Sequence, residues 1–138
     1  MENNFTSNPI EHLFRNRFSS ASISLLWKGN DAFETILNTI KSAESFICLQ
    51  FYIFRNDETG TSIAELLKQK SSEGVKVYVL YDHFGSIGTP KSFWNNMKNN
   101  GVQVRVSHPF RWNAPCYYAH RDHRKLIIVD GKKAFTGG

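Results

Sequence analysis

Short apolar runs alternate with longer amphipathic stretches along most of this chain. Residues 45–54 are rich in aromatic and β-branched side chains and lack a helical period, which predicts a buried strand. Residues 75–81 alternate valine with lysine, tyrosine and leucine, a pattern typical of a second inner strand. Shorter runs predict four further strands, of which the last two are joined by a hairpin: 23–27, 102–106, 125–129 and 133–136.

Three helices are predicted between these strands, because apolar residues there recur at intervals of three and four. Cap and turn residues mark their ends. The predicted bounds are Gly29-Asn30-Asp31 to about Ala43, a Ser62 and Glu65 capping box to Gly74, and Thr89-Pro90 to Gly101. Helices that alternate with strands indicate an α/β fold, a layered sandwich in which helices flank a mostly parallel or mixed sheet.

Length and composition favour one domain of ordinary globular character. The chain has 138 residues, of which 41% are hydrophobic, too many for a disordered chain. We expect residues 1–20 to be an irregular or weakly helical lead-in and residues 21–138 to form the domain. Two cysteines do not make a disulfide framework, and the longest apolar run, 46–54, is too short to span a bilayer. No signal peptide is recognised, so a cytoplasmic protein is expected.

One segment near the end of the chain carries recognisable chemistry. His123, Lys125 and Asp130 stand at the spacing H-x-K-x4-D, and the pair Gly137 and Gly138 follows. Strand period two predicts that His123 and Lys125 share one face of the strand. A lysine beside a histidine suits a phosphodiester, because the ammonium neutralises the phosphate while the imidazole attacks phosphorus or moves a proton. The net charge of +5 agrees with an anionic partner.

This segment resembles the HKD motif, H-x-K-x4-D-x6-G-G, of the phospholipase D superfamily. The likeness continues upstream, where several blocks are similar to the bacterial cardiolipin synthase branch. These blocks are 27–33, 49–57 with Gly60, 74–77 with 80–82, Gly85 with Ser86, 121–125 and 129–131. Together they span residues 23 to 138 and imply a phospholipase D-like fold.

The resemblance also implies roles for the motif residues. His123 matches the histidine that forms a covalent phosphohistidine or protonates the leaving alcohol, and we take it as the nucleophile. Lys125 matches the phosphate-binding lysine, Asp130 an aspartate of chiefly structural role, and Gly137 and Gly138 permit close approach of backbone to the substrate. No metal and no cofactor is implied. A bell-shaped pH profile near neutrality is expected for a pair of such histidines.

Enzymes of this superfamily use two HKD motifs that face each other, and this chain carries one. The resemblance therefore implies the N-terminal half of a phosphatidyltransferase, truncated after its first motif and inactive alone. Its expected partners are an anionic phospholipid headgroup of the phosphatidylglycerol type and a second HKD half, in the same chain or a second subunit. We expect peripheral contact with the inner face of the cell membrane.

Two other readings remain open. One is a single-motif phosphodiesterase or nuclease that acts as a homodimer, and the other is a non-catalytic module that binds phosphate. A basic cluster near the motif is compatible with a nucleic-acid groove. Its members are Arg121, Arg124, Lys125, Lys132 and Lys133.

Several further residues have both a functional and an ordinary structural interpretation. Cys116, His120 and His123 supply three metal ligands at a spacing that matches no standard zinc pattern. His83 and His108 read as loop histidines, and Asp82 either binds a ligand at the end of its strand or caps the next loop. The aromatic loop 110–118 either meets a lipid headgroup or packs on its own small core.

Overall fold

The computed structural model describes residues 22–109 and 123–137, which form a five-stranded sheet and three helices. The strands are β1 (Phe46–Phe51), β2 (Lys76–Asp82), β3 (Gln103–Ser107), β4 (Lys125–Val129) and β5 (Lys133–Gly137). The helices are α2 (Gly29–Lys41), α3 (Glu58–Ser72) and α4 (Lys91–Asn99). The predicted α/β class is confirmed.

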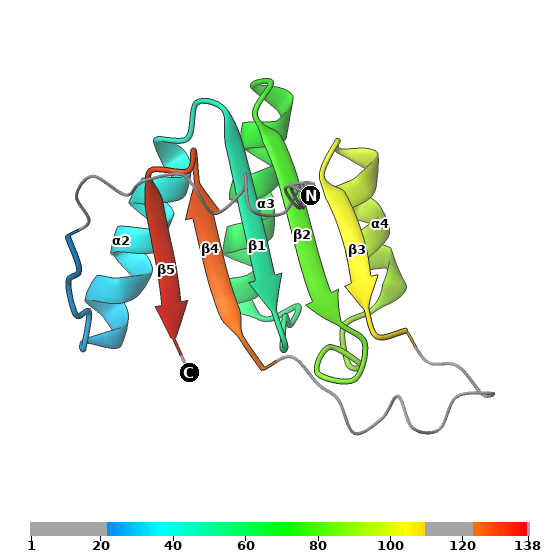
Figure 1. Cartoon of the computed structure of the whole chain (residues 1–138). Coiled ribbons are helices and arrows are strands. Elements are labelled where there is room, and N and C mark those ends of the chain that lie inside the picture. The colour runs from blue at the N-terminus through cyan, green and yellow to red at the C-terminus, as the bar shows by residue number, and fades with distance from the viewer. Residues whose placement is uncertain (1–21, 110–122, 138) are drawn as a thin grey trace, which may run out of the picture.

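The sheet is mixed, with the order β3-β2-β1-β4-β5. Strands β1, β2 and β3 are parallel, whereas β4 runs antiparallel to both β1 and β5. The ends of β1, β2, β3 and β5 and the beginning of β4 therefore meet at one edge of the sheet, at the bottom of Figure 1. We call this the carboxyl edge, and the other the amino edge. The start of β4, Lys125, and the end of β2, Asp82, both lie at the carboxyl edge.

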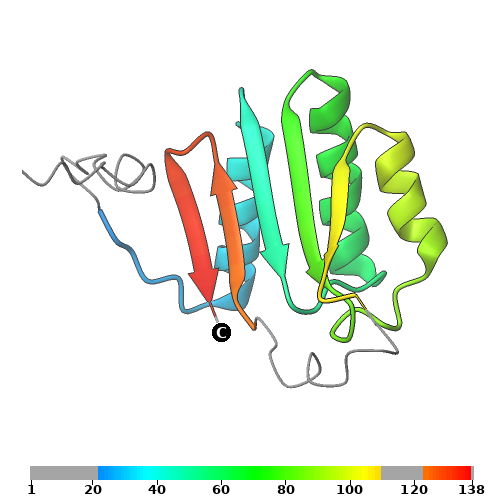
Figure 2. The same ribbon diagram turned by 45° about the vertical axis from the view of Figure 1, so that its right-hand side comes forward.

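All three helices lie on the same face of the sheet (Figures 1 and 2). Alternate residues of the inner strands point toward them, such as Ile47 and Leu49 of β1 and Val77 and Val79 of β2. These side chains are buried with Leu67 of α3 in one hydrophobic core. The opposite face of the sheet is half-exposed. In the described residues, helices therefore cover one face of the sheet and not both.

The predicted strand at 23–27 is wrong for this structure. Residues 22–27 pair with no strand of the described sheet, and Ile23 and Leu25 are 96% and 85% exposed. Their alternation has the period of a strand, but a strand forms only against a partner that takes up its backbone hydrogen bonds. Alternating apolar residues alone therefore do not make this segment a strand.

The start of helix α3 also differs from the prediction. The N-cap is Asp57, whose carboxylate accepts a hydrogen bond from the Gly60 N–H at 2.8 Å. Ser62 is inside the helix, and its hydroxyl donates to the Glu58 carbonyl at 2.8 Å. The helix begins earlier than predicted because the Asp57 side chain satisfies one of its first free N–H groups. The residues of this first turn are polar, so the spacing of apolar residues does not reveal it.

The other helix ends follow the prediction more closely. Gly74 and Gly101 adopt positive φ angles of +92° and +85° directly after α3 and α4, as helix-terminating glycines do. Pro90 is the N-cap of α4 rather than its first residue. Within the part of the chain that the structure describes, no helix has the length and apolar character needed to cross a bilayer.

Candidate active site

The structure divides the HKD residues between the two edges of the sheet. Lys125 opens β4 at the carboxyl edge, and its cross-strand partner there is Gly137, near the end of the chain. His123 lies just before β4, at the same edge. Asp130 follows the other end of β4. It lies about 16 Å along the strand from Lys125, at about 3.3 Å per residue. His123, Lys125 and Gly137 are thus brought together, and Asp130 is separated from them.

His123 is exposed and precedes β4. The alternation of side chains along a strand therefore places Lys125, but it does not place His123 on the same face. Its ring contacts the ring of Tyr52, which follows β1. The two ring centroids are 4.3 Å apart and the planes meet at 86°, an edge-to-face contact. Sequence reasoning gave Tyr52 no role of its own, because nothing local in the sequence shows which ring lies beside the histidine.

Lys125 faces a hollow of about 660 Å³ beside β4 and β5. Leu25, Ile36, Phe51 and Phe135 are among the apolar side chains that form its walls. Lys125 is the one charged side chain that the described part of the chain contributes to its lining. The hollow therefore places a single positive charge against apolar surface, a combination that suits an anionic amphiphile. A Cβ on Gly137, which also lines it, would meet nothing within 4 Å. The described protein atoms thus leave space at this position, and the role of Gly137 toward the substrate stays a prediction.

Gly138, Cys116 and His120 lie outside the described residues, as do Arg121 and the aromatic loop 110–118. The readings that depend on them stay predictions. Among the residues of 22–109 and 123–137, no group of three His, Cys, Asp or Glu side chains is arranged to hold a metal ion.

Asp82 ends β2 at the carboxyl edge and is 2% exposed. One carboxylate oxygen accepts hydrogen bonds from the N–H groups of Phe84 at 2.9 Å and Gly85 at 3.4 Å. The other lies 3.4 Å from Nδ1 of His108, which in turn is 2.7 Å from the Ser107 hydroxyl. Asp82 therefore caps the loop that follows it, in agreement with the structural interpretation, and it anchors the end of β3 as well.

Asp130 holds the amino edge together. Its carboxylate accepts hydrogen bonds from three consecutive N–H groups, those of Glu44 at 2.9 Å and of Ser45 and Phe46 at 2.8 Å. These bonds, led by the one from Glu44, lower the pKa of Asp130 because they favour its charged form, and Lys132 adds to the effect. Asp130 thus ties the end of the motif strand to the start of β1. These bonds give Asp130 a structural role at the amino edge, and its place among the catalytic residues stays a prediction.

Replacing Asp130 by asparagine is expected to lower the Tm at pH 7 by about 5 °C or more, because an amide cannot accept all three N–H groups as an anion does. Since the pKa of Asp130 is lowered by folding, its contribution is present above the unfolded pKa and is lost as the pH falls through the folded one. The Tm difference between wild type and Asp130→Asn should therefore shrink below about pH 4, which thermal unfolding at several pH values measures.

Asp31→Asn, in the first turn of α2, is the matched control and should change Tm little at any pH. Equal losses for both variants, or a loss at Asp130 that does not vary with pH, would contradict the assigned role.

The structure separates the predicted basic cluster. Arg124 and Lys125 lie at the carboxyl edge, whereas Lys132 and Lys133 lie at the amino edge, in the turn after β4 and at the start of β5. The length of the strand lies between the two pairs. The described members of the cluster therefore do not form one continuous basic groove.

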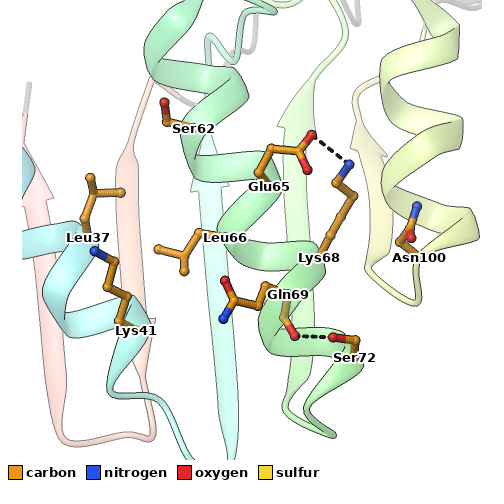
Figure 3. A pocket seen from close by; sticks show the side chains of 9 residues that line it. All are labelled: Leu37, Lys41, Ser62, Glu65, Leu66, Lys68, Gln69, Ser72 and Asn100. Carbon is orange, nitrogen blue, oxygen red and sulfur yellow. Dashed lines mark hydrogen bonds and ion pairs between the residues drawn. The ribbon is translucent and has the colours of Figure 1, made fainter.

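A second hollow, of about 610 Å³, lies among the three helices, away from the motif (Figure 3). Several of its polar side chains already have partners: Lys68 reaches Glu65 at 2.8 Å and Asn96 at 2.7 Å, and the Ser72 hydroxyl donates to the backbone carbonyl of Gln69 at 2.7 Å. Among the described residues, its lining contains no histidine and no residue of the motif. This hollow is therefore separate from His123 and Lys125, which lie at the carboxyl edge.

The family model described as "Cardiolipin synthase, PLD-like domain" matches residues 36–138. The chain belongs to this family. Among its curated relatives, cardiolipin synthase A of Pseudomonas fluorescens is 38% identical over 117 residues, which cover 84% of this chain and 24% of the relative. Cardiolipin synthase 2 of Bacillus cereus is 38% identical over 139 residues, with 93% and 27% covered. This member of the family thus spans about a quarter of the length of the relatives it matches.

Two solved structures share its fold. NucT from Helicobacter pylori superposes with a TM-score of 0.61 at 21% identity, covering 83% of this chain and 70% of that one. Nuc from Salmonella typhimurium, a phospholipase D family member, gives a TM-score of 0.52 at 26% identity, covering 70% and 56%. The predicted phospholipase D-like architecture is confirmed.

Proposed function

We propose that this chain is the first-motif half of a phosphatidyltransferase that acts on an anionic phospholipid. The observation that carries the proposal is the carboxyl edge itself, where His123 precedes the strand that Lys125 opens. Of the described residues that line the mostly apolar hollow there, Lys125 is the charged one. Membership of the cardiolipin synthase family supports the same reading.

The proposed reaction proceeds through a phosphohistidine. A nitrogen of neutral His123 attacks the phosphorus of the phosphodiester, a P–N bond forms, and the P–O bond to the headgroup alcohol breaks. Lys125 stabilises the negative charge that builds up on the phosphoryl oxygens. A proton must reach the leaving alcohol, and the histidine of a second HKD half supplies it. A second alcohol then attacks the phosphorus, the P–N bond to His123 breaks, and the histidine of the second half takes up the proton of that alcohol.

The proposal requires a second half, because one histidine cannot serve as nucleophile and as acid in the same step. That half comes either from further along the same polypeptide or from a second subunit. We therefore expect the 138-residue chain alone to turn over no lipid.

The alternative is a phosphodiesterase of the Nuc kind that works as a homodimer. The fold likeness to Nuc supports it. Against it stand the divided basic cluster and the apolar walls around Lys125, since a nucleic-acid groove needs positive charge along its length. These features favour a lipid phosphodiester.

The deciding experiment supplies the assembled two-motif protein with phosphatidylglycerol vesicles and, separately, with single-stranded DNA. We expect release of glycerol with formation of cardiolipin and no cleavage of the DNA. Cleavage of the DNA by a homodimer, with no turnover of lipid, would replace this proposal with the alternative.

Peripheral contact with the inner face of the cell membrane belongs to the same proposal. Leu25 and Trp27, on the segment that walls the hollow, are 85% and 78% exposed, and the Lys28 ammonium lies 5.1 Å from the Trp27 ring centre. Exposed leucine and tryptophan next to a cation suit an anionic bilayer surface.

Replacing both Leu25 and Trp27 by glutamine is expected to weaken binding to phosphatidylglycerol vesicles about tenfold or more, because two large apolar side chains no longer enter the interface. Vesicle sedimentation measures the change. Ile87→Gln, at a side chain 73% exposed elsewhere, is the control and should bind as wild type does. Unchanged binding by the double variant would remove this segment from the membrane contact.

A further inference from the structure

We propose that Tyr52 is the positioning residue for His123, and this inference rests on the proposed function. The evidence is their perpendicular ring contact, with centroids 4.3 Å apart. An edge-to-face neighbour opposes rotation of the imidazole, because most other ring orientations lose the favourable contact or collide with it. Tyr52 thus acts on the reaction through His123 and needs no contact of its own with the substrate.

Among the described residues, the sheet pairing begins after His123 and does not itself fix its imidazole ring. His123 is exposed and lies before the first residue of β4, where the sheet's hydrogen bonds no longer hold the backbone. Gln50 of β1 pairs with Leu126 of β4, so the chain just beyond β1 lies beside the chain just before β4. This pairing delivers Tyr52 to the histidine.

Tyr52 is itself held firmly by the loop after β2. Gly85 packs against it so closely that a Cβ there would lie 2.1 Å from the Tyr52 carbonyl oxygen and 3.1 Å from the first ring carbon. The hydroxyl of buried Ser86 donates to the same carbonyl at 3.4 Å and accepts the N–H of Phe54 at 3.0 Å. Buried Thr89 then donates to the Phe54 carbonyl at 2.6 Å.

We call Gly85, Ser86 and Thr89 the clamp. The clamp fixes the backbone on both sides of residue 53, so the Tyr52 ring has a defined direction from which to hold His123. In-line attack on phosphorus requires the nucleophilic nitrogen to be aimed, and a freely rotating imidazole spends less time in the reactive orientation. The clamp and Tyr52 therefore form one connected support for the proposed nucleophile, His123.

The test uses the 138-residue chain and phosphoramidate, a small phosphoryl donor. The nitrogen of His123 attacks phosphorus, the P–N bond of phosphoramidate breaks, and ammonia leaves with a proton from the donor. The rate of phosphorylation at His123 is read by peptide mass mapping. The histidine Cε1–H resonance is followed by NMR, because a ring 4.3 Å away shifts it while the contact persists.

We expect Tyr52→Phe, which keeps the ring, to match wild type in both measurements. Tyr52→Leu should slow phosphorylation about fivefold to tenfold and move the His123 resonance toward its unstructured position. Tyr78→Leu, which removes a half-exposed tyrosine from the open face of the sheet, is the matched control and should change neither. Tyr52→Met repeats the test with an unbranched side chain if the leucine variant unfolds.

Three results would overturn the inference: an unchanged rate in Tyr52→Leu, an unchanged His123 resonance in that variant, or a Tyr52→Phe variant as slow as Tyr52→Leu. Failure of the proposed function has a different signature. In that case wild-type His123 takes up no phosphoryl group faster than the other histidines, while the resonance still reports whether Tyr52 holds the ring.

Discussion

Alanine in place of His123 is expected to lower phosphatidyl transfer by the assembled two-motif enzyme at least about 1,000-fold, and to abolish the phosphohistidine. Without the imidazole no P–N bond can form at this position, and water is a far poorer nucleophile toward a phosphodiester. Because His123 is exposed, the substitution removes no packed core atoms and Tm should hardly change. Cardiolipin formation from phosphatidylglycerol and mass mapping of the trapped phosphoenzyme measure the two losses.

His83→Ala is the control for this prediction. His83 also lies at the carboxyl edge, where it contacts Phe84, but it does not belong to the motif. Its replacement should leave the transfer rate within about twofold, as for surface changes away from the reacting groups. If the His123→Ala enzyme transferred phosphatidyl groups at the wild-type rate, the assignment of the nucleophile would be wrong.

The second large effect is on stability and concerns Gly85. Alanine there would bring its Cβ to 2.1 Å from the Tyr52 carbonyl oxygen, a distance at which backbone must move. The carbonyl belongs to the backbone at the end of β1, so the strain cannot be relieved by turning a side chain. We expect Gly85→Ala to lose about 3 kcal/mol of unfolding free energy, or to fold incompletely.

Gly88→Ala provides a matched control in the same loop, because a Cβ at Gly88 meets nothing within 4 Å. It should change the unfolding free energy by less than about 1 kcal/mol in either direction. Urea unfolding of both variants measures the difference. Equal stability of the two would mean that the loop accommodates the extra atom, and the clamp would then not be rigid.

Most of the sheet could be predicted from the sequence because its inner strands have a clear apolar pattern. Residues 46–51 and 76–82 are continuous or alternating apolar runs, and burial between sheet and helices demands that pattern. The segment 23–27 shows the same alternation, but no strand of the described residues pairs with it. Apolar period reports what a segment can bury, and pairing partners decide whether it becomes a strand.

The candidate site could be predicted only in part, because some of its residues meet through strand pairing and not through their local sequence. The fixed spacing of His123 and Lys125 and their place at a strand entrance are local features. Tyr52 comes from a distant part of the sequence and meets His123 only through the pairing of β1 with β4. The basic cluster was misleading in the opposite way, because residues near in sequence were carried to opposite edges by one extended strand.

The position of β4 has a consequence for the order of folding. Strands β1, β2 and β3 follow one another along the chain and pair with their neighbours, whereas β4 must return across the whole parallel unit to pair with β1. Long-range pairings form late because closing a long loop costs entropy before contacts repay it. During synthesis the parallel unit can therefore form first, with the free side of β1 waiting for the β4–β5 hairpin. His123 and Lys125 would then join a sheet whose parallel part is already built.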